Sequence, residues 1–218
     1  MEQDKLDQQS QHWEKNFSDK PEMFGLDPSV AAIKALKIFK EKKISNIIEL
    51  GAGLVRDTIF FAKNSIHVHA LDYSISAVKK INQKVKEQNL LKLIKTEVFD
   101  IRKTLKFSNE SFQCCYSHML YCMALNNLDL LNLNNEIFRI LKKDGINIYT
   151  VRNTSDGDYM NGTHSGENLY ENDGFIVNFF SKEKIQSLSK GFKNIKIENF
   201  EEGNFPRKLF FVENQKFP

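Results

Sequence analysis

The feature that most constrains this chain is a glycine turn that follows a short apolar run. Residues 47–57 read Ile-Ile-Glu-Leu-Gly-Ala-Gly-Leu-Val-Arg-Asp, so a β-rich run meets an acid and two glycines before a helical segment. A second apolar run, residues 66–71, ends in Asp72, nineteen residues after Gly53. A strand, a glycine turn, a helix and a second strand that ends in a carboxylate form the nucleoside-binding half of a Rossmann-like unit. The pattern therefore predicts a nucleoside-type cofactor, because the carboxylate can accept hydrogen bonds from both ribose hydroxyls.

Position 56 separates two kinds of nucleoside cofactor. A dinucleotide fingerprint needs Gly or Ala there for close packing of the helix on the strand, but this chain has Arg56. The acid-x-Gly-x-Gly pattern of residues 49–53 and the run Ala-Leu-Asp-Tyr-Ser at 70–74 instead resemble the first motifs of class I S-adenosylmethionine-dependent methyltransferases. That resemblance implies S-adenosylmethionine as the cofactor. The chain departs from the family at Val55, where a third glycine is common.

The resemblance also implies which residues hold the cofactor. The glycine turn lies beside its methionine part, the acid after the second strand holds the ribose, and the acid after the third strand accepts from the adenine amino group. Such ligands bind at the carboxyl ends of parallel strands. A plainer alternative is that an acid after a strand caps the next helix and that the tyrosine packs on the surface. The expected cofactor residues are Trp13, Glu49, Gly51, Ala52, Gly53, Asp72, Tyr73, Asp100, Ile101 and Ser117.

Strands alternate with helices along one continuous domain, 1–218, which favours an α/β fold with a parallel sheet covered on both faces. The resemblance implies a Rossmann-like, seven-stranded, mostly parallel sheet with helices on both faces and an antiparallel last strand. We expect a lid and first helix in 1–43, a cofactor-binding core in 44–151, and a substrate-side insertion with C-terminal strands in 152–218. Strands are expected at about 44–50, 66–72, 93–99, 112–117, 146–151, 195–200 and 208–212. Helices are expected at about 27–41 with Asp27 as N-cap, 56–63, from Ser74 onward, 130–141 and 181–191.

Composition excludes several classes of protein. Hydrophobic residues make up 41% and charged residues 27%, and the net charge is +3. No apolar run reaches the roughly 18 to 20 residues that span a bilayer, and residues 1–5 lack the apolar core of a signal peptide. We therefore expect a cytoplasmic protein that does not contact a membrane. Basic residues are not interleaved with aromatics, so no nucleic-acid partner is indicated.

The three cysteines do not indicate a metal or iron–sulfur site. Cys114, Cys115 and Cys122 lack the C-x-x-x-C-x-x-C spacing of radical enzymes that cleave the same cofactor. Cys114 and Cys115 are neighbours in an expected strand, so their side chains point to opposite faces. We interpret them as buried apolar residues and expect no metal.

The sequence indicates the acceptor site less clearly than the cofactor site. His118, just after the fourth strand, is the candidate general base, with the alternative that it only orders its loop. Tyr121 is expected to face the transferred methyl group, and Arg152 and Tyr170 are expected to bind a polar or anionic substrate in the long, irregular stretch 152–180. An exposed arginine at a strand end is the alternative for Arg152. By resemblance, the segment around Trp13 folds over the cofactor as a lid.

These features predict methyl transfer from S-adenosylmethionine to a small-molecule acceptor by in-line displacement. The sequence after the fourth strand, Ser-His-Met-Leu at 117–120, lacks the Asn/Asp-Pro-Pro-aromatic run of methyltransferases that act on DNA bases. A non-catalytic module that binds S-adenosylmethionine or a partner is the alternative, and a nicotinamide-dependent oxidoreductase is disfavoured by Arg56. The acceptor atom and the oligomeric state are left open.

Overall fold

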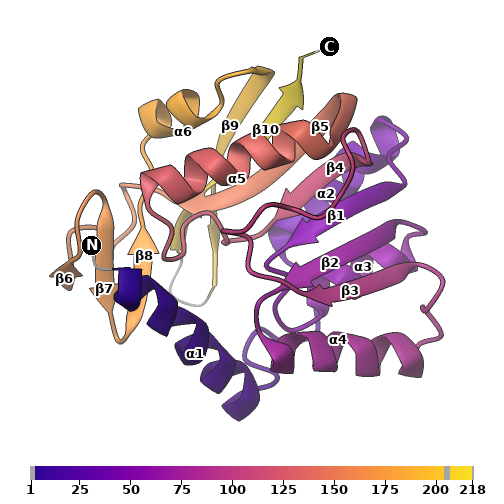
Figure 1. Ribbon diagram of the computed structural model, residues 1–218, viewed down its shortest axis with the longest axis horizontal. Helices are drawn as coiled ribbons and strands as arrows, with labels where there is room; N and C mark the ends of the chain where they lie inside the picture. Colours follow the sequence, from indigo (N-terminus) through magenta and orange to yellow (C-terminus); the bar gives the residue numbers. More distant parts are fainter. Residues whose placement is uncertain (1–2, 204–206, 218) are drawn as a thin grey trace.

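The computed structural model describes residues 3–203 and 207–217, and within them seven strands form one twisted sheet (Figure 1). The strand order is β3–β2–β1–β4–β5–β10–β9. The first five strands in the chain run parallel, whereas β10 runs antiparallel to both β5 and β9. The predicted mostly parallel sheet with an antiparallel last strand is confirmed. The strands are β1 Asn46–Leu50, β2 His67–Asp72, β3 Ile94–Val98, β4 Phe112–Ser117, β5 Leu141–Arg152, β9 Phe192–Glu202 and β10 Arg207–Lys216.

Helices cover both faces of this sheet and bury a hydrophobic core on each. Helices α2, α3 and α4 pack on one face, while α5 and α6 pack on the other. Cys114 belongs to the first core and Cys115 to the second, so the predicted opposite orientation of these neighbours is confirmed. The bounds are α2 Val30–Glu41, α3 Arg56–Lys63, α4 Ile75–Glu87, α5 Asn127–Ile140 and α6 Lys182–Leu188. Among the described residues, no helix combines the length and the apolarity that a membrane crossing requires.

The start of α2 corrects one expectation. Its N-cap is Ser29 and not Asp27, because the Ser29 hydroxyl accepts from the backbone N–H of Ala32 at 2.9 Å. Ser29 is also held from outside the helix: its backbone N–H and its hydroxyl both donate to the buried carboxylate of Asp57 on α3. The Tyr116 hydroxyl on β4 donates to the same carboxylate at 2.9 Å. One acid thus joins α2, α3 and β4.

Residues 152–180 are more regular than predicted. They contain a three-stranded antiparallel sheet, β6 Thr163–His164, β7 Leu169–Asn172 and β8 Phe175–Asn178. Strands β7 and β8 are joined by two residues, Asp173 and Gly174, at positive φ of 50° and 81°. Two positive φ values define a type I′ turn, and Asp-Gly is a preferred sequence for it. The expectation of an irregular stretch was therefore wrong, and the Asp-Gly pair could have predicted the hairpin.

Three smaller differences concern where elements begin and end. Residues 142–145, between the expected helix at 130–141 and the expected strand at 146–151, form a bulge within β5, because Phe112 pairs with Leu141 but Cys114 already pairs with Ile146. Helix α6 ends at Leu188, three residues before Gly191. The segment before residue 20 forms a helix, α1 Gln3–Asp19, which was not assigned from the sequence. In Figure 1, α1 lies between the small β6–β8 sheet and α4.

The contacts of the buried Asp57 carboxylate with Ser29 and Tyr116 lead to a stability prediction. We expect Ser29→Ala to lower the free energy of unfolding by about 2 kcal/mol, because the change removes both an N-cap and a donor to a buried carboxylate. Urea denaturation followed by circular dichroism measures this. Ser181→Ala, which removes the half-buried N-cap of α6, is the matched control, and we expect a loss of about 1 kcal/mol. Equal losses in the two variants would contradict the structural role given to Asp57.

Candidate functional site

The predicted cofactor residues meet at one edge of the sheet. Strands β1, β2 and β4 are hydrogen-bonded neighbours and end side by side, at Leu50, Asp72 and Ser117. The chain continues to β2 on one side of β1 and to β4 on the other, so the strand order reverses here. Ligands of doubly wound sheets bind at such a point. The glycine turn, the acids and the loop after β4 therefore share the position at which a cofactor site is expected.

The glycine turn is held by backbone contacts. The N–H groups of Gly51 and Ala52 both donate to the Leu71 carbonyl at the end of β2, at 2.8 and 3.1 Å. Gly51 has φ +66°, and a Cβ there would come within 3.0 Å of the Leu120 side chain. A side chain at position 51 would thus meet both backbone strain and a neighbour. Glycine is required by the turn itself.

Val55 closes the turn in a backbone conformation that favours glycine. Its φ is +93°, a genuine outlier for a β-branched residue. Conformations of this kind cost on the order of 1–3 kcal/mol and persist only where the surroundings impose them. The Val55 side chain is buried in the core between the sheet and α2–α4. The chain therefore keeps a glycine-like backbone at the position where the family often has a third glycine.

Asp72 is fixed beside this turn by two backbone donors. Its Oδ2 accepts from the N–H of Gly53 and its Oδ1 from the N–H of Ser74, each at 2.8 Å. Burial raises the pKa of Asp72 to about 6, although the two hydrogen bonds partly oppose this. The predicted N-cap of α4 is confirmed as Ser74, whose hydroxyl accepts from Ala77 N. The carboxylate of Asp72 therefore faces the turn in addition to the helix start.

The first acid of the motif, Glu49, contacts α3. Its Oε2 accepts from the Thr58 hydroxyl at 2.6 Å, and the residue is almost fully buried. Burial raises the pKa of Glu49 well above its ordinary value, and the nearby carboxylates of Asp57 and Asp72 raise it further. Glu49 thus packs behind the glycine turn.

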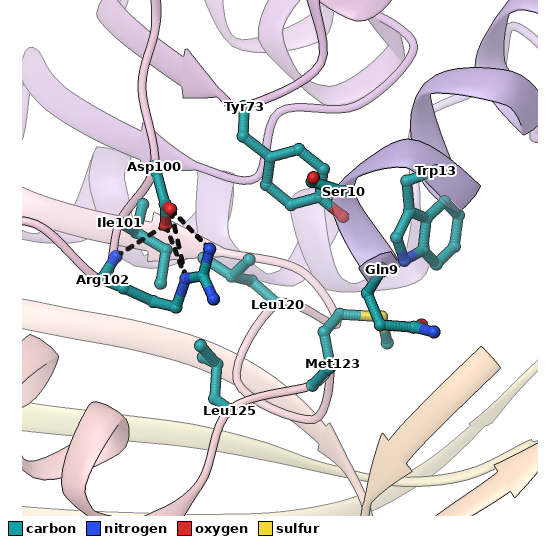
Figure 2. Close-up of a pocket in the computed structure, with 11 residues that line it drawn as sticks. Gln9, Ser10, Trp13, Tyr73, Asp100, Ile101, Arg102, Leu120, Met123 and Leu125 are labelled. Carbon is teal, nitrogen blue, oxygen red and sulfur yellow. Dashed lines mark hydrogen bonds and ion pairs between the residues drawn. The ribbon is translucent and has the colours of Figure 1, made fainter. Parts of the chain in front are cut away.

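A small cavity of about 40 Å³ lies beyond Asp72 and is walled by four segments of the chain (Figure 2). Tyr73 follows β2, residues 100–102 follow β3, and Leu120 with residues 123–125 follows β4, while α1 adds Gln9, Ser10 and Trp13. The structure therefore brings Trp13, Tyr73, Asp100 and Ile101 together as predicted neighbours. Ser117 is fully buried at the end of β4, and among residues 3–203 and 207–217 its hydroxyl has no hydrogen-bond partner.

Arg102 is a charged residue in this cavity that the sequence reasoning missed. Its Nε and Nη2 donate to the two oxygens of Asp100, and its Nη1 donates to Asp7 on α1 at 2.6 Å. Burial alone would raise the pKa of Asp100, but the hydrogen bonds from Arg102 outweigh burial, and the pKa is lowered. The sequence did contain a signal for this contact, because Arg102 is a basic residue two positions after Asp100, an expected cofactor-binding acid.

Helix α1 is docked over the cavity by both polar and aromatic contacts. Gln9 exchanges two hydrogen bonds with the β7–β8 hairpin, donating to Gly174 O at 2.9 Å and accepting from Ile176 N at 3.1 Å. The Trp13 ring lies 4.8 Å from that of Phe175 in the same hairpin. At the other side, Glu14 accepts from the hydroxyls of Ser74 and Ser76 at the start of α4, each at 2.6 Å. The helix therefore bridges the insertion and the cofactor-binding core.

His118 lies at the carboxyl edge with both ring nitrogens facing protein groups. Its Nδ1 is 2.9 Å from the Thr150 hydroxyl oxygen and its Nε2 is 3.4 Å from Oε2 of Glu202. The same Thr150 oxygen accepts from Met119 N at 2.9 Å. Burial lowers the pKa of His118, although the carboxylates of Asp57 and Glu202 oppose this. The imidazole is therefore neutral near pH 7.

Two of the three residues expected on the substrate side, Tyr121 and Arg152, are buried against other protein groups. Tyr121 is fully buried, stacked on Tyr149 with ring centroids 4.2 Å apart, and its hydroxyl accepts from Asn147. It is a core residue, because the loop after β4 turns back at Met119, whose φ is +65°. The expectation that Tyr121 faces the transferred methyl group was therefore wrong.

The Arg152 side chain likewise interacts with other protein groups. It is buried, it forms ion pairs with Asp156 and Asp158, and its guanidinium lies 5.2 Å from the centre of the Phe179 ring. Two carboxylates already balance the charge of Arg152, so the expectation that it binds a substrate was wrong. Because the side chain is buried, the alternative of an exposed arginine was wrong as well. Tyr170 is half-buried and packs at 5.6 Å against Tyr159 within the insertion. None of these three side chains lines the cavity beside Asp100.

The cysteines are buried free thiols, and burial raises the pKa of Cys115 and Cys122, the latter to about 11. Within the part of the chain that the structure describes, no cluster of three or more His, Cys, Asp or Glu side chains is arranged to hold a metal ion.

Comparison with known proteins agrees with the geometry of this edge. Residues 47–145, which include the glycine turn, Asp72, Asp100 and β4, match the family model described as a methyltransferase domain. None of the curated proteins matches the sequence significantly.

Several solved structures share the fold. The 1,6-didemethyltoxoflavin-N1-methyltransferase of Burkholderia thailandensis, solved with 1,6-didemethyltoxoflavin and S-adenosylhomocysteine, aligns over 96% of this chain and 88% of its own, with TM-score 0.75 and 13% identity. The N-methyltransferase NodS of Bradyrhizobium japonicum, in complex with S-adenosylhomocysteine, aligns over 95% of this chain and 97% of its own, with TM-score 0.70 and 13% identity. Phosphoethanolamine N-methyltransferase 2 of Haemonchus contortus aligns over 98% of this chain and 59% of its own, with TM-score 0.72 and 17% identity.

At these identities the structural likeness establishes the fold. Residues 47–145 match a methyltransferase domain, and the chain shares the Rossmann-like fold of S-adenosylmethionine-dependent methyltransferases.

Proposed function

We propose that this enzyme transfers the methyl group of S-adenosylmethionine to a small-molecule acceptor by in-line displacement. The observation that carries the proposal is the pairing of Asp72 with the glycine turn, because it puts a buried carboxylate and an open backbone at the switch point of the sheet. The free thiols of the chain suit a reducing compartment, and we place the enzyme in the cytoplasm.

The residues at this edge fit the cofactor. Asp72 would accept from the ribose hydroxyls, Asp100 and the backbone of Ile101 would contact the adenine, and Tyr73 with Trp13 would flank the rings. Gly51, Ala52 and Gly53 would border the methionine part, with Glu49 supporting the turn from behind. The buried Ser117 hydroxyl, which no described residue satisfies, would find a partner in the ligand. The cofactor supplies a methyl group on a positively charged sulfur, which leaves with the bonding electron pair when a nucleophile attacks.

The small-molecule acceptor is supported by the enclosure of the site. The cavity is bounded by α1, which the β7–β8 hairpin holds in place, and this leaves less room at the edge for a macromolecule than for a metabolite. Two of the similar enzymes were solved with small acceptors, 1,6-didemethyltoxoflavin and phosphomonomethylethanolamine. In-line transfer needs positioning and exclusion of water more than covalent chemistry from the protein, and a covering helix provides both.

His118 would handle the proton when the acceptor arrives as a hydroxyl, thiol or ammonium group. The Thr150 oxygen accepts from Met119 N, so its hydroxyl hydrogen is available for Nδ1 of His118. In that tautomer Nε2 carries a hydrogen and faces Glu202. A proton lost by the acceptor would be taken up at Nδ1 of the neutral imidazole, in place of the hydrogen bond from Thr150, and the Glu202 carboxylate beside Nε2 would balance the charge of the imidazolium.

The first prediction on function concerns Asp72. We expect S-adenosylmethionine and S-adenosylhomocysteine to bind with micromolar affinity in a calorimetric titration, and we expect Asp72→Asn to weaken binding at least about tenfold, because one acceptor for the ribose hydroxyls is lost. Asp144→Asn, the same change at an exposed acid before the buried part of β5, is the control and keeps full affinity. NAD binding, or equal affinity of the two variants, would contradict the assignment.

The raised pKa of Asp72 leads to a pH prediction. The ribose hydroxyls donate to the ionised carboxylate, so ligand binding must displace the proton that Asp72 carries below about pH 6. Affinity for S-adenosylhomocysteine should therefore be constant between pH 7 and 8 and fall as the pH drops below about 6, by up to about tenfold per unit. Titrations across pH 5 to 8 measure this. The residual binding of Asp72→Asn should lack the pH dependence, and a similar profile in that variant would assign the titration to another group.

Product formation tests the proton role of His118. Acceptors found by screening for S-adenosylhomocysteine release are compared in wild type and His118→Gln. We expect kcat/KM for an acceptor that must lose a proton to fall by about a hundredfold or more, because general bases contribute on this scale, while cofactor affinity stays unchanged. A loss confined to cofactor affinity would mean that His118 only orders its loop, and a complete lack of product with every acceptor would favour a binding module.

A further inference from the structure

Arg102 occupies a position that neither the motif nor the proposed chemistry explains. It lies in the cavity beside Asp100 and pairs with that acid (Figure 2). Its guanidinium also pairs with Asp7 on α1. Toward Asp100, its Nη2 donates to Oδ2 at 2.7 Å and its Nε lies 3.0 Å from Oδ1. Toward α1, its Nη1 donates to Asp7 at 2.6 Å. One side chain thus joins the expected base-binding acid to the covering helix.

The contacts of Asp100 put Arg102 in competition with a ligand. Both carboxylate oxygens accept from Arg102, and Oδ1 also accepts from the Arg102 backbone N–H at 3.0 Å. A carboxylate offers about four lone-pair sites, and three N–H groups of Arg102 already address them, with the Nε–H shared between both oxygens. An adenine amino group that donates to Asp100 would therefore compete with this shared Nε–H.

Helix α1 forms one wall of the cavity beside Asp100, through Gln9, Ser10 and Trp13. Helix α1 is the wall that can separate from the sheet, because side-chain contacts to three neighbouring segments hold it there. The polar contacts are Arg102 with Asp7, Gln9 with the β7–β8 hairpin, and Glu14 with the start of α4, and aromatic contacts of Trp13 add to them.

We propose that Arg102 is a latch that couples recognition of the adenine amino group to the closure of α1. When the amino group donates to Asp100, the guanidinium loses part of its hydrogen bonding to that acid. Its ion pair with Asp7 then becomes its main interaction. The ligand thereby strengthens the docking of the helix that covers it. This inference rests on the proposed cofactor role of Asp100, and it makes Arg102 and Asp7 positioning residues for closure.

The test measures helix closure separately from ligand binding. Amide hydrogen exchange of residues 7–15 and the dissociation rate of S-adenosylhomocysteine are compared in wild type, Arg102→Leu, Asp7→Asn and Asp19→Asn. Asp19→Asn is the matched control, because it removes an acid on the same helix whose ion pair with Lys15 is exposed and distant from Asp100. The Asp7 variant leaves the Arg102–Asp100 pair in place, so the test does not depend on the Arg102 variant folding.

We expect ligand to slow exchange in α1 of wild type and Asp19→Asn, and much less in the two latch variants. Dissociation from the latch variants should be about two- to fivefold faster, which is the effect of one partly exposed ion pair. An S-adenosylhomocysteine analogue with hydrogen in place of the 6-amino group should protect α1 of wild type no better than the natural ligand protects Asp7→Asn.

The possible failures are distinguishable. If all four proteins bind S-adenosylhomocysteine and protect α1 equally, the latch is refuted while the cofactor assignment stands. Equal protection of wild-type α1 by the natural ligand and the analogue would likewise refute the coupling. If wild type binds no S-adenosylhomocysteine, the proposed function and this inference are overturned together.

Discussion

The rest of the site depends on one buried carboxylate between two backbone donors. Asp72 takes the N–H of Gly53 from the turn after β1 and the N–H of Ser74 from the start of α4. These two contacts tie the glycine turn, the end of β2 and the first turn of α4 into a single unit. Burying an ionised carboxylate is costly unless donors compensate for the lost water, and backbone N–H groups compensate without flexible side chains. A rigid frame for a nucleoside follows from this arrangement.

A second layer of polar contacts places α1 over that frame. Glu14 reaches the same α4 start that Asp72 holds, so the covering helix and the proposed ribose acid share Ser74 as a common neighbour. On its other side the helix contacts the β7–β8 hairpin, which comes from more than 150 residues later in the chain. Helix α1 is polar over much of its length, and an isolated helix of its size is marginal in water. Its stability here comes from docking, which is why its position is coupled to the site below it.

Local signals in the sequence were sufficient to predict the frame of the proposed cofactor site, but they were insufficient to predict the acceptor site. Strand β4 and helix α3 have the predicted bounds, because the apolar run of β4 and the glycine turn before α3 are signals that act over a few residues. Arg152 and Tyr121 were misassigned for a different reason. The partners of Arg152 lie in a loop whose path the sequence does not reveal, and the orientation of Tyr121 follows from a single positive φ at Met119. Burial set by tertiary contacts overrides what position along the chain suggests.

The Asp-Gly turn of the insertion has a consequence for how enzymes of this shape diversify. A Cβ at Gly174 would lie 2.9 Å from Cε1 of the His12 ring, so the tip of the hairpin and the covering helix fit each other without spare room. The hairpin belongs to the region in which acceptor preferences would be expected to vary, whereas α1 covers the proposed cofactor site. A change in one therefore constrains the other. A chimera that exchanges residues 152–180 for the corresponding insertion of another methyltransferase will need the matching first helix as well.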